Sequence, residues 1–319
     1  MKPRMIELFC GAGLFGHAFN ENGFEALFSA DLDHDAISSL QFNSKHKKAV
    51  VHDATKVLSI EADIIIAGPP CQGFSTLGKR DSKDKRNQLS LVLIDWAKAS
   101  GAQVIVIENV PQFQKSPQFD ILKRAFAKLG FEFDSWRLNA VEFGVPQKRE
   151  RSFTIFSKKG LPNKPSPQHL TSNVRQAFAN LSINENDPMH FIAPISKTAK
   201  ERYENIPEKG GKMDLLRRRP DLCPESWVKL GIQAVDVWGR MDFDKPSNTI
   251  RCSFQNPSKG RYIHPTENRV ITLREGARLQ GVPDEWVFSG SRTSIARQIG
   301  NGVPLGLGRA VANEIAQIF

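Results

Sequence analysis

The chain has 319 residues, of which 40% are hydrophobic and 24% charged, so it can form one large domain or two modest ones with proper cores. No apolar run approaches the roughly 18 residues of a membrane span, and the basic start leads straight into a short strand, so we expect an untargeted cytoplasmic protein. The net charge of +10 favours a polyanionic partner, with nucleic acid the first candidate.

Short apolar strands alternate with helical patterns in the first half of the chain. Strands are predicted at residues 5–9, 26–30, 49–52, 64–68, 104–108, 131–138 and 153–157. Helices are predicted at residues 14–22, 34–42, 88–100 and 119–129. This alternation is typical of an α/β fold with a doubly wound, mostly parallel, Rossmann-like sheet.

A Pro-rich, charged stretch at 158–167 predicts a domain boundary. We therefore expect a first domain over 1–165 and a smaller, loop-rich second domain over 166–289, where clean periodicity is lost. The last part, 290–319, is helical again and is expected to return to the first domain.

A glycine pattern, G-x-G-x-x-G, follows the first predicted strand at Gly11, Gly13 and Gly16. Glycines at this spacing allow a tight turn and close approach of the backbone to a ligand, and Asp31 ends the second strand where a carboxylate could accept from ribose hydroxyls. The pattern is compatible with NAD, with S-adenosylmethionine or with a turn that binds no ligand. Asp53 could contact an adenine amine or belong to a turn.

Two further strand ends carry reactive side chains. Pro69 and Pro70 fix the backbone before Cys71, as expected for a presented nucleophile, although a buried inert thiol is the alternative. Glu108 follows a wholly apolar strand, where burial would raise its pKa and allow it to donate a proton, or where it could simply cap the next loop.

Basic residues gather in short clusters instead of a tail. In an extended chain Arg149 and Arg151 point to one face and could bind an oxygen-rich substrate, whereas a solvated strand is the alternative. The four cysteines lack the paired spacing of a zinc site or a disulfide framework, so no metal is expected; they are Cys10, Cys71, Cys223 and Cys252.

Taken in order, these motifs resemble those of the cytosine-C5 DNA methyltransferases of the bacterial restriction-modification type, whose fold is the class I methyltransferase fold. The resemblance rests on Ile6-Glu7-Leu8-Phe9-Cys10-Gly11-Ala12-Gly13, Gly68-Pro69-Pro70-Cys71-Gln72-Gly73-Phe74-Ser75, Glu108-Asn109-Val110, Gln147-Lys148-Arg149-Glu150-Arg151, Arg274 to Gly281 and Gly300-Asn301-Gly302-Val303-Pro304. It covers nearly the whole chain except about 165–240, and it departs from the family at Leu14, where another Gly is common.

The resemblance implies a DNA (cytosine-5-)-methyltransferase that transfers a methyl group from S-adenosyl-L-methionine to C5 of a flipped-out cytosine, leaving S-adenosyl-L-homocysteine. Cys71 would add to C6, Glu108 would protonate N3, Arg151 would contact the base oxygen and Arg149 would order the carboxylate. The second domain would recognise the target. The implied cofactor contacts are Phe9, Gly11, Gly13, Leu14, Asp31, Leu32, Asp53, Pro69, Leu89, Asn301 and Val303.

For DNA, we expect contacts from the basic segment after Cys71 and from the recognition region, namely Ser75, Lys79, Arg80, Arg86, Arg240, Thr249 and Arg251. The expected partner is double-stranded DNA, with no membrane, in the bacterial cytosol at the nucleoid. A cognate restriction endonuclease would act on the same site without stable binding, and the protein would be a monomer. The rival readings are an RNA cytosine methyltransferase, an NAD oxidoreductase and an inactive DNA-binding protein.

Overall fold

A computed structural model of the chain describes residues 1–44, 48–70, 85–168, 172–181, 187–230 and 235–319. The described part contains a seven-stranded sheet in the order β3-β2-β1-β4-β5-β7-β6. Strands β1 to β5 pair with one another in parallel, whereas β7 is antiparallel to both β5 and β6. The predicted mostly parallel α/β sheet is confirmed. The strands are β1 (Arg4–Leu8), β2 (Glu25–Asp31), β3 (Ala49–Val51), β4 (Ile64–Ala67), β5 (Val104–Asn109), β6 (Glu132–Asn139) and β7 (Glu150–Ser157).

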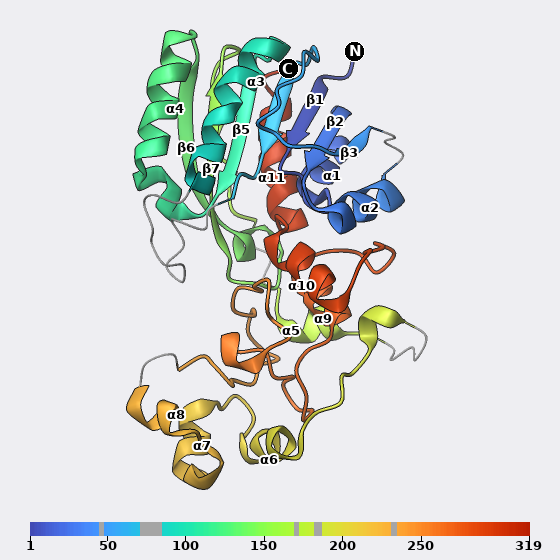
Figure 1. Cartoon of the computed structure of the whole chain (residues 1–319), viewed down its shortest axis with the longest axis vertical. Helices are drawn as coiled ribbons and strands as arrows, with labels where there is room; N and C mark the ends of the chain where they lie inside the picture. Colours follow the sequence, from blue (N-terminus) through green and yellow to red (C-terminus); the bar gives the residue numbers. More distant parts are fainter. Residues whose placement is uncertain (45–47, 71–84, 169–171, 182–186, 231–234) are drawn as a thin grey trace.

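Helices cover both faces of this sheet (Figure 1). One apolar core joins the sheet to α1 (Leu14–Glu21) and α11 (Leu305–Ala316), and a second joins it to α3 (Val92–Ser100) and α4 (Pro117–Lys128). Successive residues of β4 enter opposite cores, since side chains alternate along a strand. This is why the central strands read as unbroken apolar runs. A further helix, α2 (His34–Asn43), packs beside β3.

Local chemistry moves two helix starts from their predicted positions. The Ser116 hydroxyl accepts from the amide of Phe119, and Pro117 occupies the first turn, so α4 begins two residues earlier than predicted. The predicted helix over 88–100 is split into a 3-10 helix, Lys85–Leu91, and α3, which ends at Gly101 in the left-handed region.

The second half of the chain is loop-rich and forms the lower part of the molecule in Figure 1. Its short helices are α5 (Val174–Phe178), α6 (Lys197–Asn205), α7 (Lys212–Arg218) and α8 (Glu225–Leu230). Two tryptophans, Trp227 and Trp238, anchor a small core there. Between this region and the sheet lie α9 (Leu273–Leu279) and α10 (Arg292–Asn301), and α11 then runs back along the sheet. Among the described helices, none has the length and hydropathy to cross a membrane.

Candidate active site

The ends of β1, β4 and β5 converge at one edge of the sheet. A methyl group placed on Gly68, just after β4, would lie 3.5 Å from the Glu108 carboxylate at the end of β5 and 3.7 Å from the carbonyl oxygen of Phe9 after β1. The carboxyl ends of parallel strands form the usual ligand site in open α/β sheets. The sequence motifs on these three strands therefore meet at one place.

Glu108 and Arg151 form an ion pair at this edge. The Nε of Arg151 lies 2.9 Å from Oε1 of Glu108, and the two side chains are only 15% and 11% exposed. Burial raises the pKa of Glu108, while the positive charges of Arg151 and Arg149 act in the opposite direction. Burial thus favours the protonated form of this carboxyl group, and the two guanidiniums favour the ionised form.

Asn109 links this pair to the segment that precedes Cys71. Its Nδ2 donates to the carbonyl oxygen of Pro69 at 3.1 Å, and the hydroxyl of Ser152 donates to the Asn109 carbonyl. The backbone before Cys71 is thus tied to the end of β5. Cys71 itself lies outside the described residues.

Arg149 occupies a different place from Arg151. It is 2% exposed, and its guanidinium donates to the carbonyl oxygens of Ile250 at 2.8 Å and of Gly300 at 2.7 Å. Its charge lowers the pKa of Glu108, but its guanidinium donates to backbone carbonyls of the second half of the chain. The structure therefore separates the two arginines that share one face of an extended strand.

The glycine loop has the backbone that its sequence predicts. Gly11 and Gly13 have φ values of 52° and 81°, which is the left-handed region, and Gly13 precedes the first turn of α1. A methyl group on Gly13 would lie 2.2 Å from the side chain of Leu40, so this position also requires the absence of a side chain.

Asp31 stands beside this loop at the end of β2. One carboxylate oxygen accepts from the amide of Gly11 at 2.8 Å and the other from the amide of Asp33 at 3.0 Å. Each oxygen retains a lone pair for a further donor. The side chain of the neighbouring Leu32 is 65% exposed. At Asp53, Oδ1 accepts from the amide and hydroxyl of Thr55.

The remaining expected cofactor residues fall into two groups. The segment after α10 packs on the glycine loop, because a methyl group on Gly302 would lie 2.5 Å from the side chain of Leu14. Val303 in this segment is buried, and Asn301 accepts through Oδ1 from the Cys252 thiol at 2.8 Å. Leu89 is half-buried in the 3-10 helix before α3.

The expected DNA contacts differ in how accessible they are. Arg240 is buried, and its guanidinium donates to the backbone carbonyls of Tyr203, Ile206, His264 and Glu267. The guanidinium also donates to the side-chain oxygen of Asn268. The hydrogen-bond donors of Arg240 are thus engaged within the second half of the chain.

Thr249 and Arg251 lie next to the Arg149 contact at Ile250 and are more accessible. Thr249 is half-buried and Arg251 is exposed. The positions Ser75, Lys79 and Arg80, and the side chain of Arg86, are outside the described residues.

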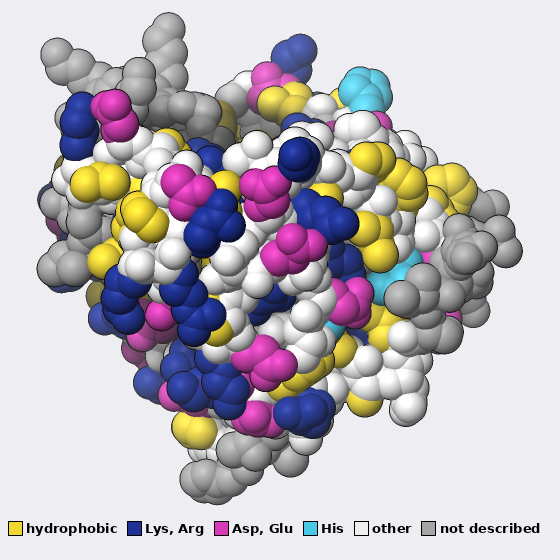
Figure 2. Space-filling view, turned by 90° about the horizontal axis from the view of Figure 1, so that it is seen from below, with side chains coloured by type: hydrophobic (Ala, Val, Ile, Leu, Met, Phe, Trp, Pro, Cys, Tyr) yellow, Lys and Arg dark blue, Asp and Glu magenta, His cyan; other side chains and the backbone are white. Residues whose placement is uncertain are grey.

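Basic and acidic side chains are mixed over the loop-rich end of the molecule, as Figure 2 shows from below. Arg219 lies 2.6 Å from Asp221, and Arg175 lies 2.7 Å from Asp244. The segment 166–289 holds 18 Lys and Arg against 15 Asp and Glu. Much of its positive charge is therefore balanced locally.

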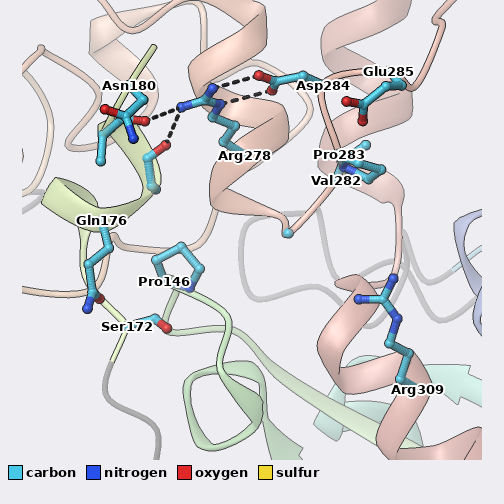
Figure 3. Close-up of a pocket in the computed structure, with 13 residues that line it drawn as sticks. Pro146, Ser172, Gln176, Asn180, Arg278, Val282, Pro283, Asp284, Glu285 and Arg309 are labelled. Carbon is cyan, nitrogen blue, oxygen red and sulfur yellow. Dashed lines mark hydrogen bonds and ion pairs between the residues drawn. The ribbon is translucent and has the colours of Figure 1, made fainter.

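A shallow hollow of about 620 Å³ lies elsewhere, where α5 faces the turn after α9 (Figure 3). Its lining includes Arg278, which donates to the carbonyl oxygens of Ala177 and Ala179 and pairs with Asp284 at 2.6 Å. None of the described candidate site residues lines this hollow. We therefore treat it as separate from the site at the sheet edge.

Three buried polar residues near the site were given no role by the sequence reasoning. Gln147 and Gln280 hydrogen-bond each other at 2.8 Å, and both are fully buried. Glu7, on β1, accepts from the amide of Gly16 at 2.8 Å and from the hydroxyl of Ser29 at 3.3 Å. A Glu inside the apolar strand Met5-Ile6-Glu7-Leu8 was the available signal for the last one, since an unpaired buried carboxylate is costly.

Comparison with known proteins identifies the family of this chain. The family model described as C-5 cytosine-specific DNA methylase matches residues 3–317. The Type II methyltransferase M.DdeI of Desulfomicrobium norvegicum is 30% identical, over 99% of this chain and 89% of that protein. The Type II methyltransferase M.Eco47II of Escherichia coli is 29% identical, over 99% and 79% respectively.

Solved structures share the fold. The chain superposes on a protein titled as a DNA modification methyltransferase encoded within an E. coli prophage with a TM-score of 0.72 and 22% identity, covering 99% of both chains. The Dnmt2 methyltransferase of S. pombe gives a TM-score of 0.68 at 16% identity, covering 99% of this chain and 98% of that one. The family model matches nearly the whole chain, and the sequence motifs meet at one edge of the sheet. The chain therefore belongs to the C-5 cytosine-specific DNA methylase family.

Proposed function

We propose that this methyltransferase uses S-adenosylmethionine to methylate C5 of a cytosine flipped out of a specific duplex sequence, through a covalent adduct between Cys71 and C6. The observation that carries the proposal is the enclosed pair of Glu108 and Arg151, 2.9 Å apart, beside the tethered backbone that leads to Cys71.

The chemistry follows from the electronics of cytosine. C5 is a poor nucleophile, so the Cys71 thiolate adds to C6 and places electron density on C5 and N3. Glu108 donates its proton to N3 as this charge develops, and Arg151 donates to the base carbonyl oxygen. C5 would then take the methyl group that S-adenosylmethionine supplies, with S-adenosylhomocysteine leaving. A base removes the C5 proton, the returning electrons expel Cys71 as a thiolate, and N3 gives its proton back to Glu108.

The described residues fit S-adenosylmethionine. When bound, this cofactor supplies an electrophilic methyl group on a sulfonium. Asp31 keeps lone pairs for ribose hydroxyls, and the exposed Leu32 offers an apolar surface for the adenine. The left-handed backbone at Gly11 and Gly13 would let the loop approach the methionine part closely. Asp53 would accept from the adenine amine, with the remaining contacts from Phe9, Leu14, Pro69, Leu89, Asn301 and Val303.

DNA binding would bring Thr249 and Arg251 against the backbone near the flipped base. A stacked C5 carbon is out of reach, so the base must leave the helix at a cost of a few kcal/mol. Phosphate contacts can offset that cost. The contacts proposed for Ser75, Lys79, Arg80 and Arg86 rest on the sequence alone.

The named relatives are Type II methyltransferases. We propose accordingly that this chain is the modification enzyme of a restriction-modification system in the bacterial cytosol. The methyltransferase would act as a monomer. A cognate endonuclease would recognise the same DNA sequence without forming a stable complex with the methyltransferase.

Methyl transfer from labelled S-adenosylmethionine to duplex DNA tests the proposal. Wild type should label the DNA, Cys71→Ser should not, and Cys223→Ser, a thiol in the second half of the chain, should label it like wild type. Bisulfite sequencing of DNA from expressing cells should then show protected cytosines in one sequence context.

A duplex with 5-fluorocytosine at that position tests the covalent step. Fluorine cannot leave as the C5 proton does, so the adduct should persist through denaturing electrophoresis with wild type only. Equal labelling by Cys71→Ser would contradict the mechanism, and protected cytosines without any shared context would contradict sequence-specific modification.

A further inference from the structure

The segment that we propose to face DNA lies directly on the segment that we propose to face the cofactor. The first is 249–251 and the second is 300–303. A methyl group on Gly300 would lie 2.3 Å from the backbone nitrogen of Cys252 and 2.4 Å from the carbonyl carbon of Arg251, so no side chain can separate them. The Cys252 thiol also donates to Asn301 at 2.8 Å. A displacement of one segment must therefore move the other.

A single guanidinium joins both segments. Nη1 of Arg149 donates to the carbonyl oxygen of Ile250 at 2.8 Å, and Nη2 donates to the carbonyl oxygens of Gly300 at 2.7 Å and Gly302 at 3.3 Å. The acceptors therefore flank Asn301 on one side and lie between Thr249 and Arg251 on the other. Charge-assisted bonds in a dry interior are strong and directional.

A pair of glutamines makes the same connection by a second route. Gln147 accepts from the amide of Ile250 at 2.8 Å and donates to Gln280, which in turn donates to the carbonyl oxygens of Ile299 and Gly302. Both backbone groups of Ile250 are thus held by residues that immediately precede β7. All of these side chains are buried, so water does not compete for their bonds.

We propose that Arg149 is a positioning residue that couples cofactor binding to DNA binding, by holding both segments in one arrangement. This inference rests on the proposed function, and it assigns Arg149 a role through the backbone instead of contact with the base. Binding of the cofactor would order Gly300 to Val303, and through Arg149 it would pre-order the segment around Ile250 for DNA. The reverse effect must be equal, because coupling between two binding sites is reciprocal.

The test measures the dissociation constant of the full chain for its methylated duplex sequence, with and without S-adenosylhomocysteine. The wild-type ratio should lie in the range of about 5 to 150 that is common for coupled sites. In Arg149→Lys the ratio should fall several-fold toward 1, because one ammonium cannot reproduce two bonds made by different guanidinium nitrogens. The glutamine pair remains and keeps part of the connection. Arg274→Lys is the matched control. It alters another buried arginine, bound to Asp187 at 2.9 Å outside the bridge, and should leave the ratio unchanged.

A wild-type measurement covers the case in which Arg149→Lys fails to fold. S-adenosylhomocysteine alone, without DNA, should slow hydrogen exchange of the Ile250 amide, and absence of that effect would overturn the inference. So would a wild-type ratio near 1 or an unchanged ratio in folded Arg149→Lys. Failure of wild type to bind the cofactor product or DNA at all would instead contradict the proposed function.

Discussion

Glu108 and Arg151 form an ion pair that is largely buried, so desolvation as well as charge attraction acts on the Glu108 carboxyl group. Desolvation raises the pKa of Glu108, and the charges of Arg151 and Arg149 act against this shift. The sequence placed a carboxylate at the end of an apolar strand, and the family resemblance implied that Arg149 orders it. The structure pairs it with Arg151.

Replacing Glu108 tests its role as proton donor. Glu108→Gln keeps the size and a hydrogen-bond donor but cannot transfer a proton, so methyl transfer in a single turnover should fall by about 10² to 10⁴. The affinity for S-adenosylhomocysteine should change little. Glu150→Gln, a neighbouring exposed carboxylate paired with Arg137, serves as control and should keep the wild-type rate. A Glu108→Gln enzyme within tenfold of wild type would rule out this role.

Glu7 shows what the same physics does without a charged partner. Burial raises its pKa from an ordinary 4.5 to about 7, against the opposing hydrogen bonds from Gly16 and Ser29. The protonated form therefore supports the fold below about pH 4.5, and this contribution is lost as the pH rises to about 7.

Glu7→Gln should consequently match wild type in stability near pH 5 and exceed it above pH 7. A pKa raised from 4.5 to about 7 corresponds to about 3 kcal/mol in the free energy of unfolding at pH 8. Denaturant unfolding at both pH values measures the difference. Glu132→Gln, on the exposed edge of β6, controls for the loss of a carboxylate. Equal offsets at both pH values would show that Glu7 is ionised throughout.

At the scale of elements, the turn between β1 and α1 is decided by backbone conformation and by close packing. Gly13 needs both its positive φ and the space beside Leu40. Gly23 also has a positive φ, of 91°, but its surroundings are open. The G-x-G-x-x-G pattern predicted the turn, whereas the contact with Leu40 depends on how α2 packs.

Gly13→Ala should weaken S-adenosylhomocysteine binding by at least about tenfold, or 1.4 kcal/mol, measured by calorimetry. The new methyl group would strain the turn and displace Leu40 or the loop. Gly23→Ala imposes a similar backbone cost outside the loop, so it should lower the melting temperature without changing this affinity. If both variants bind alike, the loop is not the cofactor site.

At the scale of the whole molecule, the net charge is +10, but the basic side chains differ in whether an acidic side chain neutralises them. Many arginines of the loop-rich end are paired with acidic side chains, as Arg219 is with Asp221. Arg251 is exposed beside the candidate site, and its Nη1 donates to the carbonyl oxygen of Lys259 at 3.1 Å. Position therefore matters more than total charge for the DNA contact.

DNA binding should weaken steeply with salt, and Arg251→Ala should reduce the slope of log K against log salt by about 1 if Arg251 meets one phosphate. Arg219→Ala should leave the slope unchanged, because that guanidinium is already paired. Fluorescence anisotropy with a labelled duplex at several salt concentrations gives both slopes. An unchanged slope in Arg251→Ala would remove this residue from the proposed interface.

The sequence by itself determined the sheet, the order of its motifs and their arrival at one edge, because strand periodicity and the rule for parallel sheets are local and general. It could not assign partners to buried polar side chains. Arg149 and Arg151 look equivalent in the chain, and Arg240 looks like a DNA contact, yet the fold gives Arg151 to Glu108 and surrounds the other two with backbone carbonyls. Those carbonyls come from residues tens to more than a hundred positions away. Only the tertiary structure decides which arginine meets a charge and which holds the chain together.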